Sequence, residues 1–541
     1  MKNKMIAGLF LLLLLLVAVL PGCGGKEPAV PENVNNENME PENQESEEPA
    51  PAGPRYGGVL RGIRATFPNV MSYIPEMSPT DTTFAQPYAE MLLKYDDGEQ
   101  KIVPELAKSW EVDPENLTIT FYLQEGVRFH DGTPFNAEAV KWNFELNLEA
   151  GSLTDGDYID WIEVVDEHTL RIHVKDFTNQ LYFNYGWSMM FSPTAFEKAG
   201  GGDREKSIEW ARRNAVGTGP FKLVEFQREN YIRYERNDDY WREGLPYLDA
   251  IEIRYMPDPM TAKASLLAGE ADIWLEVNNV EHVKELEEAG FKVNWGPGML
   301  MSLCPSVRNK NSKWHDLRLR EALEYAIDRE ALANMIGLGA YEPLHQLAVS
   351  DWPGYVPGYN PRPYDLEKAK ALLAEAGYAD GLETTILCSD NKILRDTATA
   401  IQGYLDAVGI KVHVDIADMG RYFTAAFAEG WDELLLVQSG INPDASDLFV
   451  HFGHDPMTFR TGDIYKSEKY LELVRKAIKA EKHDEFIDLI KQAVVQAGED
   501  AMIIPLYRTR QACVMAPYVH SNYIKAHAAI WNEYEDWMEE H

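Results

Sequence analysis

The sequence predicts an α/β fold, with mixed sheets flanked by helices, behind an N-terminal segment that is not part of the folded body. Strand-like and helix-like patterns alternate between about residues 55 and 525, which is typical of mixed α/β domains and unlike all-α or all-β chains. The chain has 541 residues, 45 % of them hydrophobic, so it can build the cores of two to four domains. After Leu20 no apolar run is long enough to span a membrane.

The N-terminal segment has the pattern of an exported precursor. Lys2 and Lys4 precede an apolar run from Ile6 to Leu20, which is shorter than the roughly 20 residues of a spanning helix. The run ends in Leu-Pro-Gly-Cys, which resembles the lipobox of bacterial lipoproteins, in which the cysteine is acylated and becomes the mature N-terminus. We therefore expect a signal peptide over residues 1–22 and lipidation of Cys23. The alternative is an ordinary signal anchor with an incidental cysteine.

Residues 23–54 are expected to form the acylated cysteine and a disordered linker. The stretch from Lys26 onward is dominated by Pro, Glu and Asn and contains no aromatic residue. Such a composition cannot bury enough apolar surface to offset the entropy of ordering the chain. A flexible linker of this length has an end-to-end span of about 30 Å, so it tethers the body close to the membrane.

In the first half of the body, turn and cap residues separate strands from helices. Residues 117–129 have the β-branched and aromatic content of a strand. Asn136 is a candidate N-cap for a helix that carries Val140, Phe144 and Leu148 on one face. Residues 248–258 predict a strand, and the helix after it begins at Asp258-Pro259 and stops at Gly269.

Three further segments follow the same rules in the second half. Residues 315–339 predict a long helix or a helix pair that begins at Asp316. Residues 364–378 predict a helix from the N-cap Asp365 to the stop at Gly377. Residues 398–418 predict a helix, a glycine turn and an alternating strand.

Composition limits the partners and the chemistry of the chain. A formal net charge of −36 repels nucleic acid phosphates and anionic lipid headgroups, so neither is expected to bind the body. No two cysteines share a CxxC spacing, so neither a zinc ribbon nor a dithiol redox site is indicated. Cys304, Cys388 and Cys513 are interpreted as isolated core residues, with one disulfide among them left open.

Motifs of catalysis are missing from the sequence. It contains no GxSxG, HExxH, GxxxxGK[ST] or GxGxxG motif. Gly217 and Gly219 in VGTGPF are expected to serve a tight turn, and His130-Asp131-Gly132 is expected to be a turn and not an acid–base pair. His451 and His454 are three residues apart but lack a third ligand, so we expect neither a metal site nor a cofactor.

Several stretches, taken together, resemble one protein family. They occur in the order that the family has, and they are ELAKSWEV, LTITFYLQEGVRFHDGTPFNAEAVKWNFE, VGTGPFKLVEF, YERNDDYWREGLPYLDAIEIRYMPDPMTAKASLLAGEADIW, LRLREALEYAIDREAL, YDLEKAKALLAEAGY and GYLDAVGIKVHVDIAD. The chain resembles the bacterial extracellular solute-binding proteins of family 5, the dipeptide, oligopeptide and nickel-type receptors of ABC importers.

The resemblance implies a periplasmic-binding-protein-like fold of type II. Two main lobes would be joined by two crossover segments, at residues 298–307 and 501–510, with an additional domain packed on the first lobe. Domain I would be discontinuous. The boundaries that the resemblance implies are residues 55–98, 215–302 and 508–541 for domain I, 99–214 for domain II and 303–507 for domain III.

The resemblance also implies a function without catalysis. A monomeric receptor, held outside the cytoplasm at the cell membrane by its lipid anchor, would capture a peptide or another small molecule by hinge closure and present it to the permease subunits of an ABC importer. Two alternatives remain: a sensor or surface chaperone with the same fold, and an anchored extracellular hydrolase, which would need a nucleophile–base pair in the cleft.

The class of ligand stays open at the level of sequence. In peptide-binding members, a carboxylate in a stretch that matches SGINPDASDLF (439–449) pairs with the α-amino group of the peptide. Aligned by eye, this position holds Ile441. Either Asp444 or Asp447 takes over, or the ligand is not an ordinary peptide. The residues that the resemblance places in the cleft are Gln438, Ser439, Asn442 and Asp444 as polar contacts, and Trp295, Trp187 and Tyr507 as stacking faces.

Overall fold

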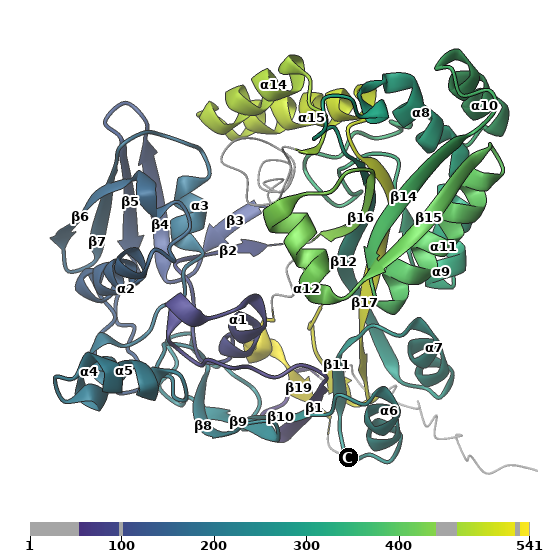
Figure 1. Cartoon of the computed structure of the whole chain (residues 1–541). Helices are drawn as coiled ribbons and strands as arrows, with labels where there is room; N and C mark the ends of the chain where they lie inside the picture. The colour runs from purple at the N-terminus through teal and green to yellow at the C-terminus, as the bar shows by residue number, and fades with distance from the viewer. Residues whose placement is uncertain (1–52, 97–100, 440–462, 525–530, 540–541) are drawn as a thin grey trace, which may run out of the picture. The chain divides into compact units, whose positions relative to one another are not determined.

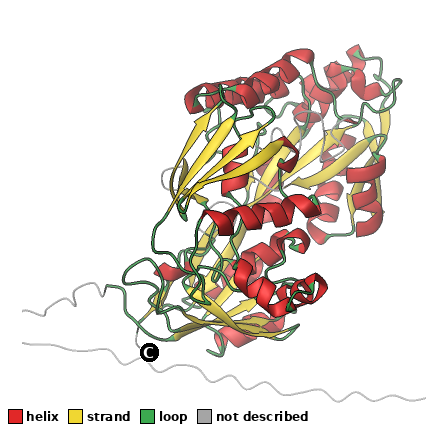
Figure 2. Cartoon of the chain, turned by 90° about the vertical axis from the view of Figure 1, so that its left-hand side faces the viewer, coloured by secondary structure: helices red, strands yellow, loops and turns green. Residues whose placement is uncertain are grey.

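The computed structural model describes residues 53–96, 101–439, 463–524 and 531–539. Helices and strands occur throughout this part of the chain (Figure 2), and the prediction of a mixed α/β fold is confirmed. Within these described ranges the main sheet has 11 strands. Its strands are β1 (Val59–Arg64), β8 (Phe221–Gln227), β9 (Tyr231–Arg236), β10 (Ala250–Tyr255), β11 (Ile273–Val277), β12 (Lys292–Pro305), β13 (Glu342–Pro343), β14 (Leu382–Ser389), β15 (Ile410–Ala417), β16 (Leu434–Ser439) and β17 (Ile504–Met515).

Two long antiparallel strands form the middle of this sheet. The strand order is β15-β14-β16-β12-β17-β11-β1-β10-β9-β8, and β13 pairs with β17. We call β14, β15 and β16 the β16 half, and β1 with β8–β11 the β1 half. β12 and β17, of 14 and 12 residues, run through both halves (Figure 1). They include most of the two segments that the family resemblance implied as crossovers, 298–307 and 501–510.

Helices cover both faces of the β16 half (Figure 1). The strand residues alternate between two cores: Leu434 and Leu436 lie in one, and Leu435 and Val437 in the other, as the period of a strand requires. The helices over the first core are α8 (Leu317–Ala326), α9 (Arg329–Gly337), α10 (Leu366–Glu375) and α11 (Lys392–Asp406). Those over the second are α12 (Met419–Phe423), α14 (Glu468–Lys479) and α15 (His483–Glu499).

The β1 half has its own cores. On one face, helices α6 (Pro259–Leu267) and α7 (Val280–Glu288) pack with Ile63 and Trp274. On the other face, α1 (Pro79–Ala85) packs with residues near the C-terminus, such as Trp531.

A separate four-stranded antiparallel sheet lies between α1 and α6 in the sequence. Its order is β4-β5-β7-β6, and α2 packs on it around Phe144. The strands are β4 (Ala107–Asp113), β5 (Thr118–Leu123), β6 (Ile159–Asp166) and β7 (Thr169–Val174). The helices of this region are α2 (Ala137–Ala150), α3 (Leu181–Gly186), α4 (Pro193–Gly200) and α5 (Arg204–Ala211). Two small sheets pair β2 (Leu93–Asp96) with β3 (Lys101–Pro104) and β18 (Val519–His520) with β19 (Trp537–Met538).

The predicted helix ends are confirmed. Asn136 accepts a hydrogen bond from the backbone N–H of Ala139 and caps α2. Asp258 and Asp365 cap α6 and α10 in the same way. Gly269 and Gly377 both have positive φ, the conformation in which glycine ends a helix without a steric cost.

The segment 315–339 takes one of its two predicted forms, the helix pair, because Ile327 is extended between α8 and α9. Two other segments differ in detail from their predictions. The strand expected over 117–129 ends at Leu123. The helix expected from residue 398 begins at Lys392, because Asn391 accepts a hydrogen bond from the backbone N–H of Ile393 and caps it there.

Gly217 and Gly219 are needed for a different reason from the tight turn that the sequence predicted. Neither residue has positive φ. Instead, Gly219 donates its backbone N–H to the carbonyl of Tyr88, and a Cβ added to Gly217 would lie 1.9 Å from that carbonyl oxygen. The two glycines therefore allow another segment of backbone to approach closely.

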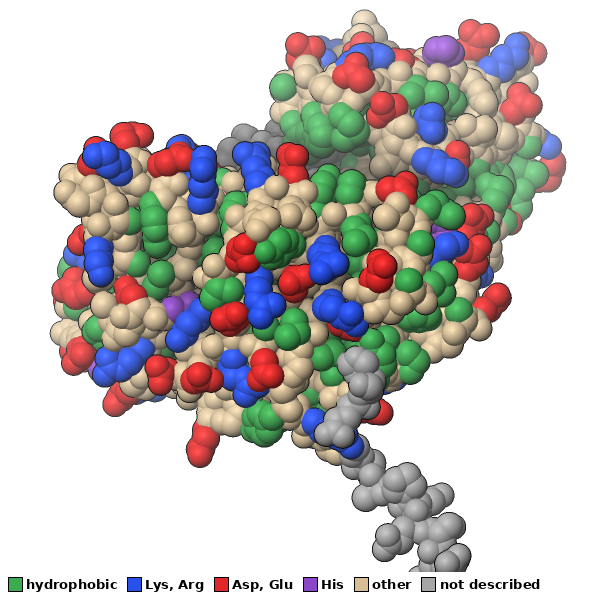
Figure 3. Space-filling view, turned by 90° about the horizontal axis from the view of Figure 1, so that it is seen from below, with side chains coloured by type: hydrophobic (Ala, Val, Ile, Leu, Met, Phe, Trp, Pro, Cys, Tyr) green, Lys and Arg blue, Asp and Glu red, His purple; other side chains and the backbone are tan. Residues whose placement is uncertain are grey.

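Acidic and basic side chains are interleaved on the face of the molecule shown in Figure 3. That face carries no broad area of one charge. The large negative net charge of the chain is therefore not concentrated there.

Candidate functional site

The end of β16 places two of the expected ligand-binding residues on opposite faces of the sheet. Ser439 pairs with Leu300 of β12, and Gln438 pairs with Met301. Neighbours along a strand point to opposite faces, so Gln438 and Ser439 cannot act as adjacent contacts of one small ligand on one face. The structure thus separates a pair that the sequence analysis grouped together.

Ser439 shares its face with an arginine that the sequence analysis did not single out. Leu300 is paired on its other side with Arg508 of β17, and Arg508 with Glu342 of β13. Residues directly opposite each other in a ladder share a face. Ser439 and Arg508 are two strands apart, which separates their backbones by about 10 Å.

Arg508 lies beside two carboxylates. Its Nη1 donates to Asp351 Oδ1 over 2.7 Å and lies 3.6 Å from Glu342 Oε2. The arginine side chain is 5 % exposed, whereas those of Asp351 and Glu342 are 42 % and 32 % exposed. We call Ser439, Arg508, Asp351 and Glu342 the polar row. One guanidinium and two carboxylates offer complementary partners to a ligand that carries both an anionic and a cationic group.

The sequence signal for this row is weak but present. Arg508 lies in AMIIPLYRTR, in the first half of β17, where a charged residue follows the apolar run from Ile504 to Tyr507 and is buried with it. A buried arginine needs a partner, and that requirement is the reason to look for one. The partners Glu342 and Asp351 lie more than 150 residues away in the sequence, in a segment without a recognisable motif.

Tyr507 is not available as a stacking face. Its ring is fully buried and lies 5.6 Å from the ring of Tyr341, nearly parallel to it. Its hydroxyl is hydrogen-bonded to Thr397 Oγ1 of α11, and burial raises the pKa of the phenol. The expectation is corrected because Tyr507 pairs with Met301, on the sheet face opposite to Arg508, where helices cover it.

The two expected tryptophans lie in different surroundings. Trp295 is half-buried on β12, opposite Ala512, and packs against two apolar cores. Trp187 follows α3, and its ring lies 4.9 Å from that of Phe183. Trp187 also lines a small cavity of about 50 Å³ together with Glu90 and Glu533. Neither tryptophan belongs to the polar row.

The cavity beside Trp187 is lined by buried acids. Glu90 accepts hydrogen bonds from Thr218, Tyr240 and Trp241. Burial, followed by the nearby charge of Glu105, raises the pKa of Glu90 to about 7. Burial also raises the pKa values of Glu105 and Glu533. A volume of about 50 Å³ suits water rather than a solute. We therefore interpret this cluster of acids as structural and not as a ligand-binding site.

Other candidate groups are held in structural contacts. Asp131 accepts hydrogen bonds from Thr133 and Ser192, and His130 Nε2 donates to the carbonyl of Gly219. Burial lowers the pKa of His130 to about 4. These contacts agree with the interpretation of residues 130–132 as a turn.

The three cysteines of the body are buried thiols. Cys304, Cys388 and Cys513 form no disulfide with one another. Burial raises the pKa of Cys388 to about 11, so the thiol is protonated at neutral pH and a poor nucleophile. The interpretation of these residues as isolated core residues is confirmed.

The remaining expected residues lie outside the described part of the chain. They are Cys23, Ile441, Asn442, Asp444, Asp447, His451 and His454. Within the described ranges, no group of three or more His, Cys, Asp and Glu side chains is placed to hold a metal ion. In the same ranges, none of the helices has the length and hydropathy needed to cross a bilayer.

Comparison with known sequences gives matches over most of the chain. The profile of the bacterial extracellular solute-binding proteins, family 5 (middle), matches residues 101–458. The glutathione-binding protein GsiB of Pectobacterium atrosepticum is 32 % identical over 385 residues, which are 68 % of this chain and 70 % of the relative.

Comparison with solved structures supports the fold. The periplasmic binding protein DppA of Helicobacter pylori, solved with the peptide STSA, covers 90 % of this chain and 99 % of its own at 24 % identity and a TM-score of 0.71. HbpA2 of Haemophilus parasuis covers 89 % of this chain and 100 % of its own at 22 % identity and a TM-score of 0.77. These likenesses bear on the fold alone.

Proposed function

The chain belongs to family 5 of the bacterial extracellular solute-binding proteins, and from this membership we propose that its ligand is a small zwitterionic peptide, with glutathione as the first candidate. Its fold is that of the type II periplasmic binding proteins, and its role is that of a solute receptor for an ABC importer. The proposal therefore concerns the identity of the ligand. The polar row supports a ligand with charged ends.

The observation that carries the proposal is the arrangement around Arg508. A carboxylate of the ligand would bind the guanidinium, and an ammonium group would bind Asp351 or Glu342, both of which are partly exposed. Ser439 Oγ, which has no hydrogen-bond partner within the residues that the structure describes, would add a hydroxyl contact to a polar group of the ligand. The named ligand of the GsiB relative, glutathione, carries both kinds of charge.

Titration calorimetry of the purified protein with glutathione and with trialanine tests the proposal. We expect micromolar or tighter binding of at least one of them. Asp351→Asn should weaken it tenfold to a hundredfold, because a hydrogen bond to a charged group contributes about 1.5–3 kcal/mol. Arg213→Gln is the matched control for Arg508→Gln, since Arg213 is 73 % exposed and pairs only with Glu209 among the described residues.

Two results would contradict the proposal. One is the absence of binding for both peptides to a protein that is folded by circular dichroism. The other is binding that Asp351→Asn and Arg508→Gln leave unchanged. Asp351 is the safer position of the two, because its partly exposed side chain can change without opening the core.

The site of attachment is a separate part of the proposal. Being a member of an extracellular family, the receptor works outside the cytoplasm, and we infer that Cys23 carries its lipid. The acyl chains would hold the body on the membrane without a spanning helix, at about 0.8 kcal/mol for each buried CH₂. Cys23→Ser should move the protein from the membrane fraction to the soluble fraction and abolish labelling with an alkyne fatty acid. Retention of Cys23→Ser in the membrane would refute the anchor.

A further inference from the structure

A second cavity, of about 380 Å³, lies between the four-stranded sheet region and the turn that joins α14 to α15. One wall comes from Trp110 on β4 and from residues at the start of α3. The opposite wall comes from Phe486 and Ile487 at the start of α15. Its volume is in the range of pockets that hold small organic ligands. It contains no residue of the polar row.

The walls are largely aromatic. The rings of Trp110 and Tyr182 lie 5.8 Å apart and are parallel to within 9°, and Phe486 is buried on the other side. Flat, rigid apolar surfaces of this kind favour an aromatic or large aliphatic group. The charged residues of the lining, Lys101, Glu481, Lys482 and His483, are exposed, so they lie at the mouth.

Two amide groups in the lining have unused hydrogen-bonding capacity. Asn179 Oδ1 and Gln180 Nε2 are buried, and neither has a hydrogen-bond partner in the described structure. Asn179 is held in place, because its backbone N–H donates to the carbonyl of Ile478 and its Nδ2 to that of Ala477. A buried polar atom without a partner is costly, and a ligand that supplied one would be bound for that reason.

The two groups are complementary to a peptide unit. Asn179 Oδ1 accepts a hydrogen bond, Gln180 Nε2 donates one, and an amide offers one N–H and one C=O. We propose that this cavity is a second binding site, for an uncharged peptide unit that carries an aromatic or large aliphatic side chain. The site goes beyond the proposed receptor function, because it needs no charged terminus on its ligand and shares no residue with the polar row.

N-acetyl-L-tryptophanamide is the probe, since it has two amide groups and an indole but no charge. Titration calorimetry with the purified protein should give a Kd on the order of 0.1 mM, which is typical of the affinity per atom of small ligands. Gln180→Leu removes the donor at similar size and should weaken binding at least fivefold. Ile487→Trp fills the cavity and should abolish binding.

Matched variants control for unspecific effects. Gln227→Leu makes the same change on β8, and Asp488→Trp adds an indole to the same helix at an exposed position outside the lining. Both should bind the probe as the unmodified protein does. No measurable binding at 5 mM probe, or equal binding by Gln180→Leu, Ile487→Trp and the controls, would overturn the proposal.

The outcome is independent of the proposed function. Binding of glutathione without the probe would leave the receptor function intact and reject this site. If the probe binds but neither glutathione nor trialanine does, this site is supported and the proposed ligand class is rejected.

Discussion

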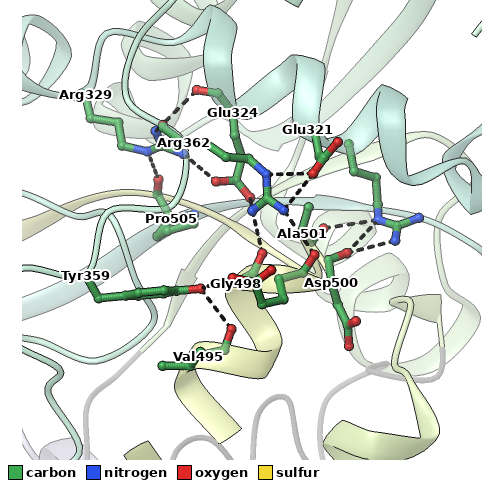
Figure 4. A network of polar contacts seen from close by, with 12 residues as sticks. Glu321, Glu324, Arg329, Tyr359, Arg362, Val495, Gly498, Asp500, Ala501 and Pro505 are labelled. Atoms are coloured by element: carbon green, nitrogen blue, oxygen red, sulfur yellow. Dashed lines mark hydrogen bonds and ion pairs between the residues drawn. The ribbon is translucent and has the colours of Figure 1, made fainter. Parts of the chain in front are cut away.

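Three buried arginines connect the α8–α9 pair to the end of α15 and to the start of β17; two of them, Arg329 and Arg362, are labelled in Figure 4. Arg320 donates to the carbonyl of Asp500, Arg329 to that of Pro505 and Arg362 to that of Glu499. Arginine suits this role because its fork of donors can satisfy several carbonyls at once. The carbonyls of Glu499 and Asp500 lie at the C-terminal end of α15, where the helix itself supplies no hydrogen-bond donor, so the arginines satisfy them.

The carboxylate of Glu324 balances two of these charges. It lies 3.2 Å from Arg329 and 3.5 Å from Arg362, and it is 2 % exposed. Removing one partner of a buried ion pair leaves an uncompensated charge and costs about 3–5 kcal/mol. We therefore expect Glu324→Ala to lower the free energy of unfolding by about that amount in urea titrations. Lys392→Ala, at an exposed i,i+4 pair, should cost less than about 0.5 kcal/mol. Equal losses for the two variants would contradict this assignment.

Asp536 should make stability depend on pH. Its carboxylate accepts hydrogen bonds from Ser521 and Trp531, yet burial raises its pKa to about 7. A raised pKa means that the folded protein holds a proton that the unfolded chain releases. This contribution is complete below about pH 4 and is lost as the pH rises through 7. His130 acts in the opposite direction, because its lowered pKa makes stability fall as the pH drops below about 6.5 toward 4.

The test compares unfolding of Asp536→Asn with that of the unmodified protein in urea at pH 5 and pH 8. The asparagine cannot ionise, so the variant should lose about 2–3 kcal/mol less than the unmodified protein between the two pH values. Identical pH profiles would show that Asp536 titrates normally.

At the scale of elements, helix ends were the part most open to prediction from sequence. A cap depends on local chemistry, a side-chain acceptor at the N-terminus and a glycine at the C-terminus, and Asn136, Asp258 and Asp365 all act as expected. The order of strands is different, because it depends on contacts far apart in sequence. The crossovers at β12 and β17 were predicted only through the family resemblance.

The candidate site was less predictable for a related reason. β16 is LLLVQS, and because its first four residues are buried on both faces, the sequence has no polar–apolar alternation that would assign Gln438 and Ser439 to faces. The pairing of Arg508 with Asp351 joins residues 157 positions apart. Tyr507 and Arg508 are neighbours in sequence, but Tyr507 points into the core and Arg508 belongs to the polar row. The register of β17 with β12 decides which of the two residues lies on which face.

The cap of α10 gives a test at this scale. Asp365 accepts a hydrogen bond from the backbone N–H of Lys368 over 3.0 Å. Asp365→Ala should lower the free energy of unfolding by about 1 kcal/mol and increase hydrogen exchange in the first turn of the helix. Glu367→Ala, two residues later at an exposed ion pair, should change both quantities little. An equal effect of the two variants would mean that the loss reflects charge at the helix N-terminus and not the cap.

For the molecule as a whole, the last turn of α14 is attached to the region of the four-stranded sheet. Lys479 Nζ donates to Asp176 Oδ2 and to the carbonyl of Phe177, each over 2.6 Å. Asn179 donates to the carbonyls of Ala477 and Ile478. These four bonds join segments about 300 residues apart, and they lie beside the second cavity, to which Asn179 contributes.

In a receptor that closes by a hinge, such a contact favours one of the two arrangements. Lys479→Met keeps the length of the side chain and removes two of the bonds, so it should shift the population toward an opened form. For a ligand that binds only the closed form, the apparent affinity is proportional to the fraction of protein that is closed, so it falls as that fraction falls. We therefore expect severalfold weaker solute binding, together with a larger radius of gyration in X-ray scattering without ligand. Lys476→Met, one turn earlier at an exposed pair with Glu472, is the control. If both variants scatter and bind like the unmodified protein, the contact of α14 with residues 176–179 does not set the balance between open and closed forms.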